Sequence, residues 1–345
     1  MSVSFIAEVS SNHSRDLNRC FEFIDSAAEI GCDAIKFQLF KVNQLFAPEI
    51  LARSEALRKR KEWELPLEFL PQLADRCKEK KIQFSCTPFY LEAVDELEPY
   101  VEFYKIASYE LLWDDLLVKC ALTGKPVIIS TGMATLKEIK HAVDILRNND
   151  CEPTVLHCTS AYPSPYQEAN LSAIETIREL TNCEMGWSDH TVNSGVINRS
   201  IHKWNAKVIE FHLDLDGEGQ EYDSGHCWLP NEIKPLIDLI KSLSNTENFK
   251  LGLEKKKINN SAVAVCKSVE LYIPLGDLVD KEEELAKLNK RLSELDSLIL
   301  SIESKLSNDE FKSKAPKNIV SGEKNKLNDF LIERTKILSN IEVLK

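Results

Sequence analysis

Short runs of β-branched and apolar residues alternate with longer amphipathic stretches over the first 240 residues or so of the chain. This alternation predicts parallel strands, each followed by a helix that covers the sheet. We predict eight strands, at residues 3–9, 34–40, 82–87, 103–108, 126–131, 153–159, 184–189 and 206–213. Helical spacing falls between them, for example at 17–31, which Gly31 would end, and at 136–149. The predicted fold class is α/β, a closed (β/α)8 TIM barrel.

The pattern changes beyond residue 260. A first apolar series has the three-and-four spacing of a coiled-coil seam, at Leu285, Leu288, Leu292, Leu295, Ile299, Ile302 and Leu306. A polar loop precedes a second series, at Leu327, Leu331, Leu338 and Ile341, flanked by Phe330, Ile337 and Leu344. The short connection predicts an antiparallel helical hairpin, a coiled coil. We therefore predict a barrel at 1–250, a linker at 251–279 and the hairpin at 280–345.

Length and composition favour a cytoplasmic globular protein. The chain has 345 residues, of which 43% are hydrophobic, so it can bury a large core. No run reaches the roughly 18 apolar residues that a membrane span needs, and the amino terminus lacks a basic segment followed by an apolar one. The ten cysteines include no C-x-x-C pair, which favours reduced, buried thiols over disulfides or a zinc knuckle.

Charge is distributed unevenly along the chain. The net charge is −12, while residues 280–345 hold thirteen basic and thirteen acidic side chains, so the acidic excess lies in residues 1–279. The negative net charge of the whole chain argues against general nucleic-acid binding by it.

Polar and ionisable residues recur at the carboxyl ends of the predicted strands, where a barrel builds its active site. They are Glu8, Lys36, Gln38, Thr87, Lys105, Ser108, Ser130, Thr131, His157, Thr159, Ser188, His190, Glu210 and His212. Any one of them could be a solvated strand end or a hydrogen-bonded core group. Two lysines and two histidines at the same end of several strands favour a site.

His190 and His212 end consecutive strands, which would place two imidazoles side by side. With the carboxylates of Glu8 and Asp223 they would suit a divalent cation that keeps positions open for water and substrate. The alternative is that each histidine is a hydrogen-bonded structural group.

A second set of strand-end groups carries positive charge and hydroxyls, namely Lys36, Lys105, Ser108, Ser130 and Ser188. These donors fit a phosphate, or a phosphate with a carboxylate. The alternative is that each lysine pairs with a neighbouring Asp or Glu. The chain has neither a G-x-G-x-x-G motif after a strand nor a Walker loop, so a nucleotide is not the expected ligand.

These residues lie within phrases that resemble the N-acetylneuraminate (sialic acid) synthase family. The phrases are IAEVSSNH (6–13), AIKFQ (34–38), TPF (87–89), YKIAS (104–108), ISTGM (129–133), LHCTSAYPSP (156–165), GWSDHT (186–191) and EFHLD (210–214). They occur in the family's order over about residues 3–240. Eight motifs in register make the resemblance specific.

The resemblance implies condensation of phosphoenolpyruvate with an open-chain N-acetylhexosamine, such as N-acetylmannosamine, to a nonulosonic acid and phosphate. By position, His190 and His212 would hold Mn2+ or Mg2+, and Glu8 would handle water or protons near the metal. Phosphoenolpyruvate would be bound by Lys36, Thr87, Lys105, Ser108, Ser130 and Ser188. Gln38, Glu110, Tyr162 and Asp223 would lie around the sugar.

Three departures from the family pattern bear on the sugar. Ser160 stands where many relatives have Asn, and the segment after the last strand carries His226 and Cys227. The family's antifreeze-like domain, whose arginine reaches the partner's sugar site, is not recognisable after residue 250. Loss of the charge-assisted hydrogen bond from that arginine to the sugar would weaken sugar binding roughly 10- to 150-fold. An acceptor on the way to legionaminate or pseudaminate is therefore an alternative.

Residues 261–345 resemble the C-terminal arm of valyl-tRNA synthetase, with KLSNDEFKSKAPKNIV between two long helices. In the synthetase this arm contacts tRNA. Here the arm is charge-balanced, whereas phosphate contacts need a basic stripe. A hairpin for self-association and a fusion remnant are the alternatives that this balance favours. A homodimer, and a non-catalytic tRNA-associated or assembly module, are left open.

Overall fold

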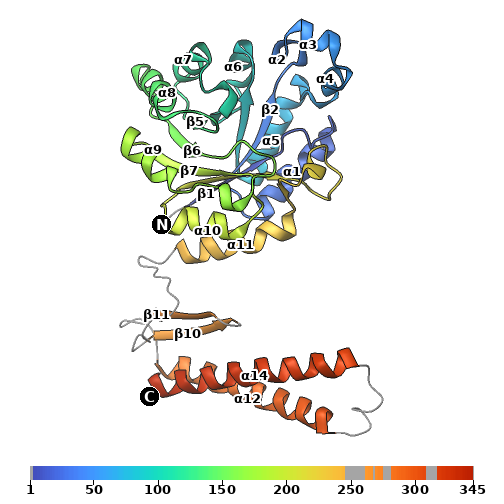
Figure 1. Cartoon of the computed structure of the whole chain (residues 1–345), viewed down its shortest axis with the longest axis vertical. Helices are drawn as coiled ribbons and strands as arrows, with labels where there is room; N and C mark the ends of the chain where they lie inside the picture. Colours follow the sequence, from blue (N-terminus) through green and yellow to red (C-terminus); the bar gives the residue numbers. More distant parts are fainter. Residues whose placement is uncertain (1–2, 245–260, 267–268, 275–280, 308–316, 345) are drawn as a thin grey trace. The chain divides into compact units, whose positions relative to one another are not determined.

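The computed structural model describes residues 3–244, 261–266, 269–274, 281–307 and 317–344. It divides into two compact units, Met1–Phe249 and Lys250–Lys345. Figure 1 labels helices and strands of both units.

The first unit is a closed barrel of eight parallel strands, which confirms the predicted fold. The strands are β1 (Ser4–Glu8), β2 (Ala34–Leu39), β3 (Gln83–Pro88), β4 (Phe103–Ile106), β5 (Val127–Ser130), β6 (Thr154–His157), β7 (Glu184–Asp189) and β8 (Val208–Leu213). Each pairs with the next along the chain, and β8 pairs with β1 to close the sheet. All eight predicted strands are present, generally shorter by one to three residues. The ends that they lose carry several of the polar groups of the site.

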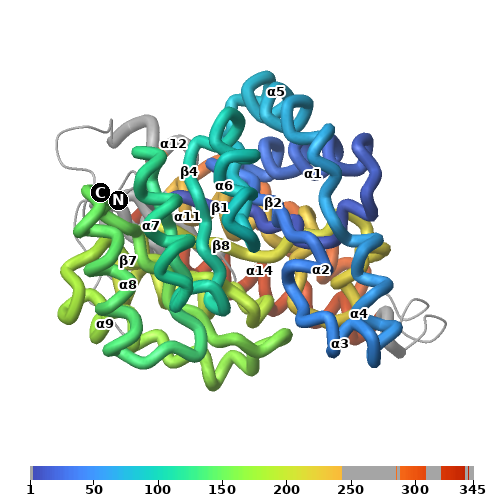
Figure 2. Tube along the Cα trace, turned by 90° about the horizontal axis from the view of Figure 1, so that it is seen from above, coloured from blue at the N-terminus to red at the C-terminus, as the bar shows by residue number. Residues whose placement is uncertain are grey.

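Helices surround the strands (Figure 2). They are α1 (Leu17–Glu29), α2 (Val42–Leu45), α3 (Pro48–Arg53), α4 (Glu55–Lys59), α5 (Leu70–Lys80), α6 (Leu91–Leu97), α7 (Asp114–Leu122), α8 (Leu136–Asn148), α9 (Ala173–Thr181), α10 (Ser194–His202) and α11 (Pro230–Ser244). Asp16 caps α1 by accepting from two backbone N–H groups, and Thr135 with Glu138 forms a capping box at α8. Gly31 has a φ of +90°, which suits the turn that ends α1.

A short ninth strand, β9 (Cys227–Trp228), pairs in parallel with the end of β8, where His212 lies opposite Cys227. The sequence pattern did not predict it, because two residues are too few for any periodicity. Its pairing returns the chain to the barrel mouth after the loop at 214–226.

The cysteines that the structure describes are reduced, buried thiols, as the sequence predicted. Nine of them are free and buried, at positions 20, 32, 77, 86, 120, 151, 158, 183 and 227. They serve as small apolar groups in the core.

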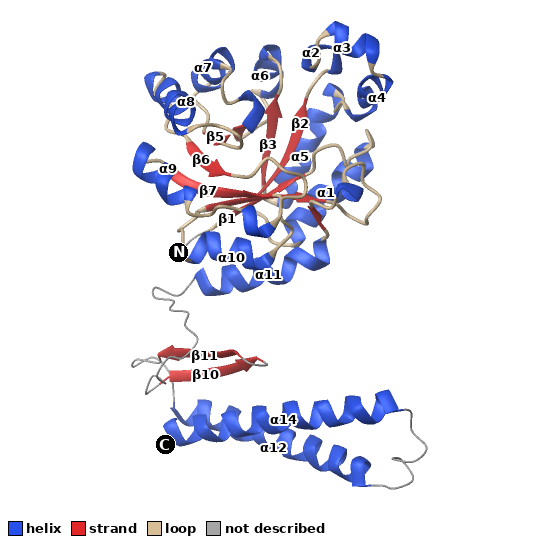
Figure 3. Ribbon diagram, in the orientation of Figure 1, coloured by secondary structure: helices blue, strands red, loops and turns tan. Residues whose placement is uncertain are grey.

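The second unit contains the predicted helical hairpin, made of α12 (Lys281–Ser307) and α14 (Lys317–Leu344) (Figure 3). Their shared core buries Leu288, Leu295, Ile337 and Ile341, with Leu285, Leu292 and Phe330 packed against it. Ion pairs between Arg291 and Glu333 and between Lys305 and Glu323 join the two antiparallel helices.

The prediction for the second arm was partly wrong. Leu331 and Leu338 are 40% and 39% exposed, while Ile337 is buried. Apolar residues form two neighbouring stripes on this helix, and the stripe through Phe330, Ile337 and Ile341 faces α12.

The segment at 251–279, which was expected to be a linker, contains regular secondary structure. Strands β10 (Ser261–Cys266) and β11 (Val269–Pro274) form an antiparallel pair within it. The rest of that stretch lies outside the described residues.

None of the described helices combines the length and the apolar surface that a membrane-spanning segment needs.

Candidate active site

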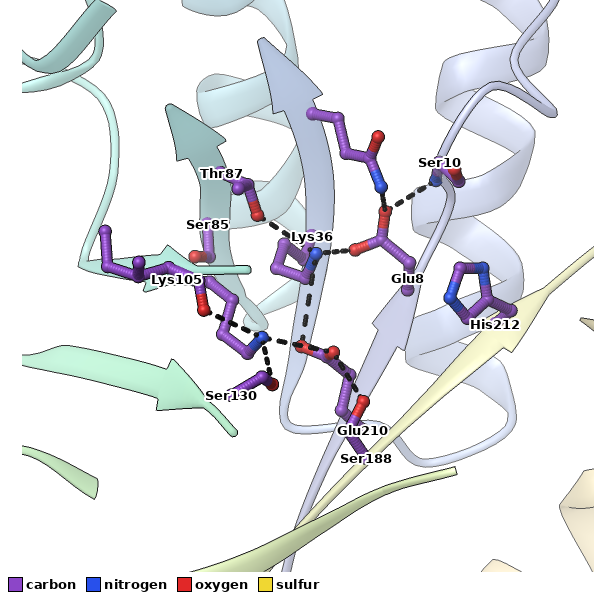
Figure 4. A network of polar contacts seen from close by, with 12 residues as sticks. Glu8, Ser10, Lys36, Ser85, Thr87, Lys105, Ser130, Ser188, Glu210 and His212 are labelled. Carbon is purple, nitrogen blue, oxygen red and sulfur yellow. Dashed lines mark hydrogen bonds and ion pairs between the residues drawn. The ribbon is translucent and has the colours of Figure 1, made fainter. Parts of the chain in front are cut away.

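Two buried lysines and two buried carboxylates form the centre of the barrel mouth (Figure 4). Lys36 on β2 pairs with Glu8 on β1 and lies 4.0 Å from a Glu210 oxygen on β8. Lys105 on β4 lies 3.5 Å from the other Glu210 oxygen. All four side chains are at most 5% exposed, so Glu210 joins two cations away from water.

Hydroxyl groups surround this centre. Lys36 donates to Thr87 at 3.1 Å, Lys105 donates to Ser130 at 2.6 Å, and Ser188 donates to Glu210 at 3.0 Å. Ser108 instead accepts from the backbone N–H of Gly132 at 3.0 Å. The structure thus brings Lys36, Thr87, Lys105, Ser130 and Ser188 together, with Ser108 beside them at the start of the short 3-10 helix η3 (Ser108–Glu110), which follows β4.

Electrostatics at this centre depend on burial. Burial lowers the pKa of Lys36 to about 8, against the opposing effect of Glu210. Burial alone would raise the pKa of Glu210, but the charges of Lys105 and Lys36 hold it below its usual range. Glu210 therefore stays ionised and keeps both lysines in place.

Three histidines and a tyrosine form a second cluster beside the first. The ring centroids of His190 and His212 are 5.4 Å apart, and those of His212 and His226 are 4.6 Å apart. The Tyr162 ring lies 4.2 Å from His190 and 5.0 Å from His226. The structure thus brings the predicted pair together and adds His226 as a third imidazole.

His190 has a defined tautomer. Its Nδ1 lies 2.8 Å from the carbonyl oxygen of Thr159, which only accepts, so Nδ1 carries the proton and Nε2 a lone pair. Burial, with the neighbouring His212, lowers the pKa of His190 to about 3. Burial also lowers the pKa of His212. Both rings are neutral, which is the form that binds a metal.

Glu221 is the site carboxylate that the sequence analysis missed. One of its oxygens lies 3.5 Å from His212 Nδ1 and 3.5 Å from His226 Nε2. Its other oxygen accepts from Ser10 at 2.6 Å. The residue lies in the irregular loop at 214–226 among four other acidic side chains, so no periodicity distinguished it.

Asp223 was expected near the metal and the sugar. It lies in the short 3-10 helix η5 (Tyr222–Ser224), where its side chain is exposed. Among the described residues it forms no hydrogen bond or ion pair with the site. Glu221, two residues earlier, occupies the place beside His212.

The other predicted residues lie around the mouth. Gln38 donates to Glu8 at 3.0 Å. Glu110 is half-buried, and burial raises its pKa to about 7. Tyr162 is 44% exposed, and Ser160 has a buried hydroxyl without a hydrogen-bond partner among the described groups.

The loop that carries Glu221 is held by the β1–α1 loop. Asn12 donates to the carbonyl oxygen of Leu213 at 3.1 Å and accepts from the backbone N–H of Glu221 at 2.8 Å. Arg19 pairs with Asp214 and Asp216 at the loop's start. The position of Glu221 is therefore fixed by neighbours that are distant in sequence.

The cluster is suited to a divalent cation. Buried atoms of His212 (Nδ1), Glu221 (Oε2) and His226 (Nδ1) have no hydrogen-bond partner among the described residues. Glu8, Glu210 and Glu221 outnumber the two lysines, which leaves one negative charge. A dication would reverse that sign before an anionic substrate binds.

Comparison with known proteins agrees with this geometry. The valyl tRNA synthetase tRNA binding arm family matches residues 280–345. N,N'-diacetyllegionaminic acid synthase of Campylobacter jejuni is 35% identical over 73% of this chain and 83% of its own length. Pseudaminic acid synthase of Helicobacter pylori is 32% identical over 74% of this chain and 77% of its own length.

A solved structure is similar as well. The N-acetylneuraminic acid synthetase of Leptospira borgpetersenii, crystallised with citrate, is 30% identical, with a TM-score of 0.66 over 73% of this chain and 88% of that one. The NeuB family matches residues 23–250, which include every strand-end group of the site from Lys36 onward. The chain belongs to the NeuB family and is a synthase-like enzyme.

Proposed function

We propose that the barrel condenses phosphoenolpyruvate with an open-chain N-acetylhexosamine to a nonulosonic acid. A carbon–carbon bond forms between the methylene carbon of phosphoenolpyruvate (C3) and the aldehyde carbon of the sugar, while water is consumed and phosphate is released. The observation that carries the proposal is the buried pair Lys36 and Lys105 beside the histidine cluster. The names of the relatives, which are nonulosonic acid synthases, support the same class of product.

The lysine side of the site is assigned to phosphoenolpyruvate. Lys36 and Lys105 supply charge, and the hydroxyls of Thr87, Ser108, Ser130 and Ser188 supply directed donors. In the unliganded site, Glu8 and Glu210 hold the lysine ammonium groups in position. Preorganised donors of this kind stabilise the charge that develops on the leaving phosphate.

A divalent metal, Mn2+ or Mg2+, is assigned to His190 and His212. When bound, it would act as a Lewis acid on the sugar aldehyde and would lower the pKa of a bound water. The hydrogen bond from His190 Nδ1 to Thr159 orients the free Nε2, as a ligand imidazole requires.

The remaining residues are assigned to the sugar and to proton handling. Glu8, oriented by Gln38 and by the backbone N–H of Ser10, would accept or deliver protons near the new bond. Glu110, with its pKa at about 7, can hold a proton at neutral pH. Tyr162 and Asp223 lie on exposed segments at the mouth, where a sugar would enter.

A second candidate acceptor is a bacillosamine-derived hexose that leads to legionaminate or pseudaminate. The Campylobacter and Helicobacter relatives carry those names, and the loop with His226 and Cys227 lies at the sugar side of the site.

Phosphate release from phosphoenolpyruvate across a panel of N-acetylhexosamines tests the proposal. Release should require both a divalent metal and one of the sugars, and Lys105→Ala should abolish it. Lys140→Ala, at an exposed helical pair with Asp144, is the matched control. Release that is independent of every sugar would contradict condensation.

A further inference from the structure

We propose that His212, Glu221, His226 and Cys227 form a four-donor cation site that favours a softer ion than Mg2+. The inference deepens the proposed function, because it adds ligands to the metal and predicts the ion's character. Metal binding is measured without substrate. The four-donor site can therefore be disproved while the proposed condensation still holds, and the condensation can be disproved while the four-donor site still holds.

The four donor atoms already lie close together. One ligand atom from each of the four residues can be chosen so that all lie within 4.8 Å of one another. Zinc bonds of 2.0–2.3 Å place the donors of a tetrahedral site about 3.3–3.8 Å apart. Small side-chain movements would therefore be enough to close the cluster around an ion.

Three of the donor residues are buried, the Glu221 side chain is 22% exposed, and the donor atoms are incompletely satisfied. His212, His226 and Cys227 are 7%, 4% and 5% exposed. The Nδ1 atoms of His212 and His226 are buried and have no hydrogen-bond partner among the described residues. The buried Oε2 atom of Glu221 also has no hydrogen-bond partner there. Three such atoms at one place are costly unless a ligand meets them.

The backbone and the second shell hold this arrangement. Pairing of β8 with β9 places Cys227 opposite His212. Ser10 donates to the second oxygen of Glu221, and the side-chain N–H of Asn12 lies 3.6 Å from the sulfur of Cys227. Oriented first-shell groups with their own hydrogen-bond partners are characteristic of metal sites.

The kind of donor selects the kind of ion. Two imidazoles, a carboxylate and a thiolate suit Zn2+, Co2+ or Fe2+, whereas Mg2+ prefers oxygen donors. His190 keeps a free Nε2 in the neighbouring position and can complete the coordination.

Titration of the metal-free full-length protein with Co2+ tests the assignment. We expect one Co2+ per chain, a near-ultraviolet sulfur-to-cobalt charge-transfer band, and displacement by Zn2+ at lower concentration than by Mg2+. Glu221→Gln and His226→Ala should each weaken Co2+ binding at least tenfold. Cys227→Ser should remove the band while circular dichroism shows a folded barrel.

His141→Ala is the matched control, because His141 is exposed and pairs with Asp114 away from the site. It should leave affinity and spectrum unchanged. Full Co2+ affinity in both Glu221→Gln and His226→Ala, or a wild-type complex without the charge-transfer band, would overturn the four-donor site. Calorimetry of phosphoenolpyruvate binding, run in parallel, reports on the condensation separately.

Discussion

At the scale of single residues, Glu210 has the most unusual surroundings. It accepts from Ser188 and faces the ammonium groups of both Lys36 and Lys105, and all three charged side chains are buried in the barrel mouth. Desolvating two lysines costs several kcal/mol each, which the fold offsets with this shared carboxylate. An incoming phosphate would find both cations already oriented.

Replacement of Glu210 should therefore be severe. We expect Glu210→Gln to lower the free energy of unfolding by about 3–5 kcal/mol, because a buried cation pair loses its counter-ion. Chemical denaturation measures the change. Asp144→Asn, which breaks an exposed pair with Lys140, should cost less than about 1 kcal/mol. Equal losses in both variants would show that Glu210 does not hold the lysines.

Glu110 predicts a pH dependence of stability. Burial raises its pKa from 4.5 to about 7, so its stabilising contribution is complete below pH 4.5 and is lost as the pH rises through 7. Between pH 4.5 and about pH 7, the free energy of unfolding of the wild-type protein should therefore fall relative to that of Glu110→Gln. Thermal unfolding at a series of pH values measures the difference. The exposed Glu179→Gln should track the wild type throughout, and a constant offset for Glu110→Gln would refute the shift.

The sequence predicted the residues that strands position. Lys36, Gln38, Thr87 and Lys105 follow from strand ends, and the barrel brings them to one mouth. Glu221 could not be predicted, because its place depends on Asn12, which is distant in the sequence. The assignments of Gln38, Glu110, Tyr162 and Asp223 to the sugar stay predictions.

At the scale of elements, the loop between β8 and β9 decides the shape of the metal side. Gly219 lies against Asp214 and Asn12, where an added Cβ would meet their atoms at 2.2 and 2.6 Å. An added side chain would therefore displace the Asp214 and Asn12 side chains, which hold the segment that carries Glu221, or would displace the segment itself.

Gly219→Ala should displace that loop. We expect a loss of about 1–3 kcal/mol in the free energy of unfolding and weaker Co2+ binding. Gly322→Ala is the control, since its added Cβ has no neighbour within 4 Å and lies in α14. Unchanged metal affinity in Gly219→Ala would mean that the loop does not position the ligands.

Elements differed in how far the sequence predicted them. The eight barrel strands coincide with short runs of β-branched and apolar residues that alternate with helical segments, and the hairpin has a heptad spacing that needs no tertiary context. Strand β9 is set by pairing with β8 alone. The exposed side of α14 was misassigned because Leu331 and Leu338 are as apolar as the residues that pack, so only the partner helix decides between the two stripes.

At the scale of the whole molecule, the two units have separate cores. Every residue assigned to the site lies before residue 228, within the unit Met1–Phe249. A chain ending at Asn259 should therefore fold and release phosphate at the full-length rate. Phosphate release by the two purified chains measures this, and loss of activity in a folded truncated chain would show that the second unit contributes to the site.

The hairpin gives a second test at this scale. Because its thirteen basic and thirteen acidic residues balance, we expect no tRNA shift at physiological salt. An electrophoretic shift assay with the full and truncated chains checks it. A shift by the full chain alone, weakening steeply with salt, would instead support a tRNA-binding arm.

Calorimetry in the presence of Mn2+ measures whether the buried lysine pair binds phosphoenolpyruvate. We expect one phosphoenolpyruvate per barrel, bound at roughly millimolar concentration or tighter, and at least tenfold weaker binding in Lys36→Ala and Lys105→Ala. Lys140→Ala should bind as the wild type does. No binding by the wild-type chain at millimolar phosphoenolpyruvate would contradict the assignment of the buried lysine pair to this substrate.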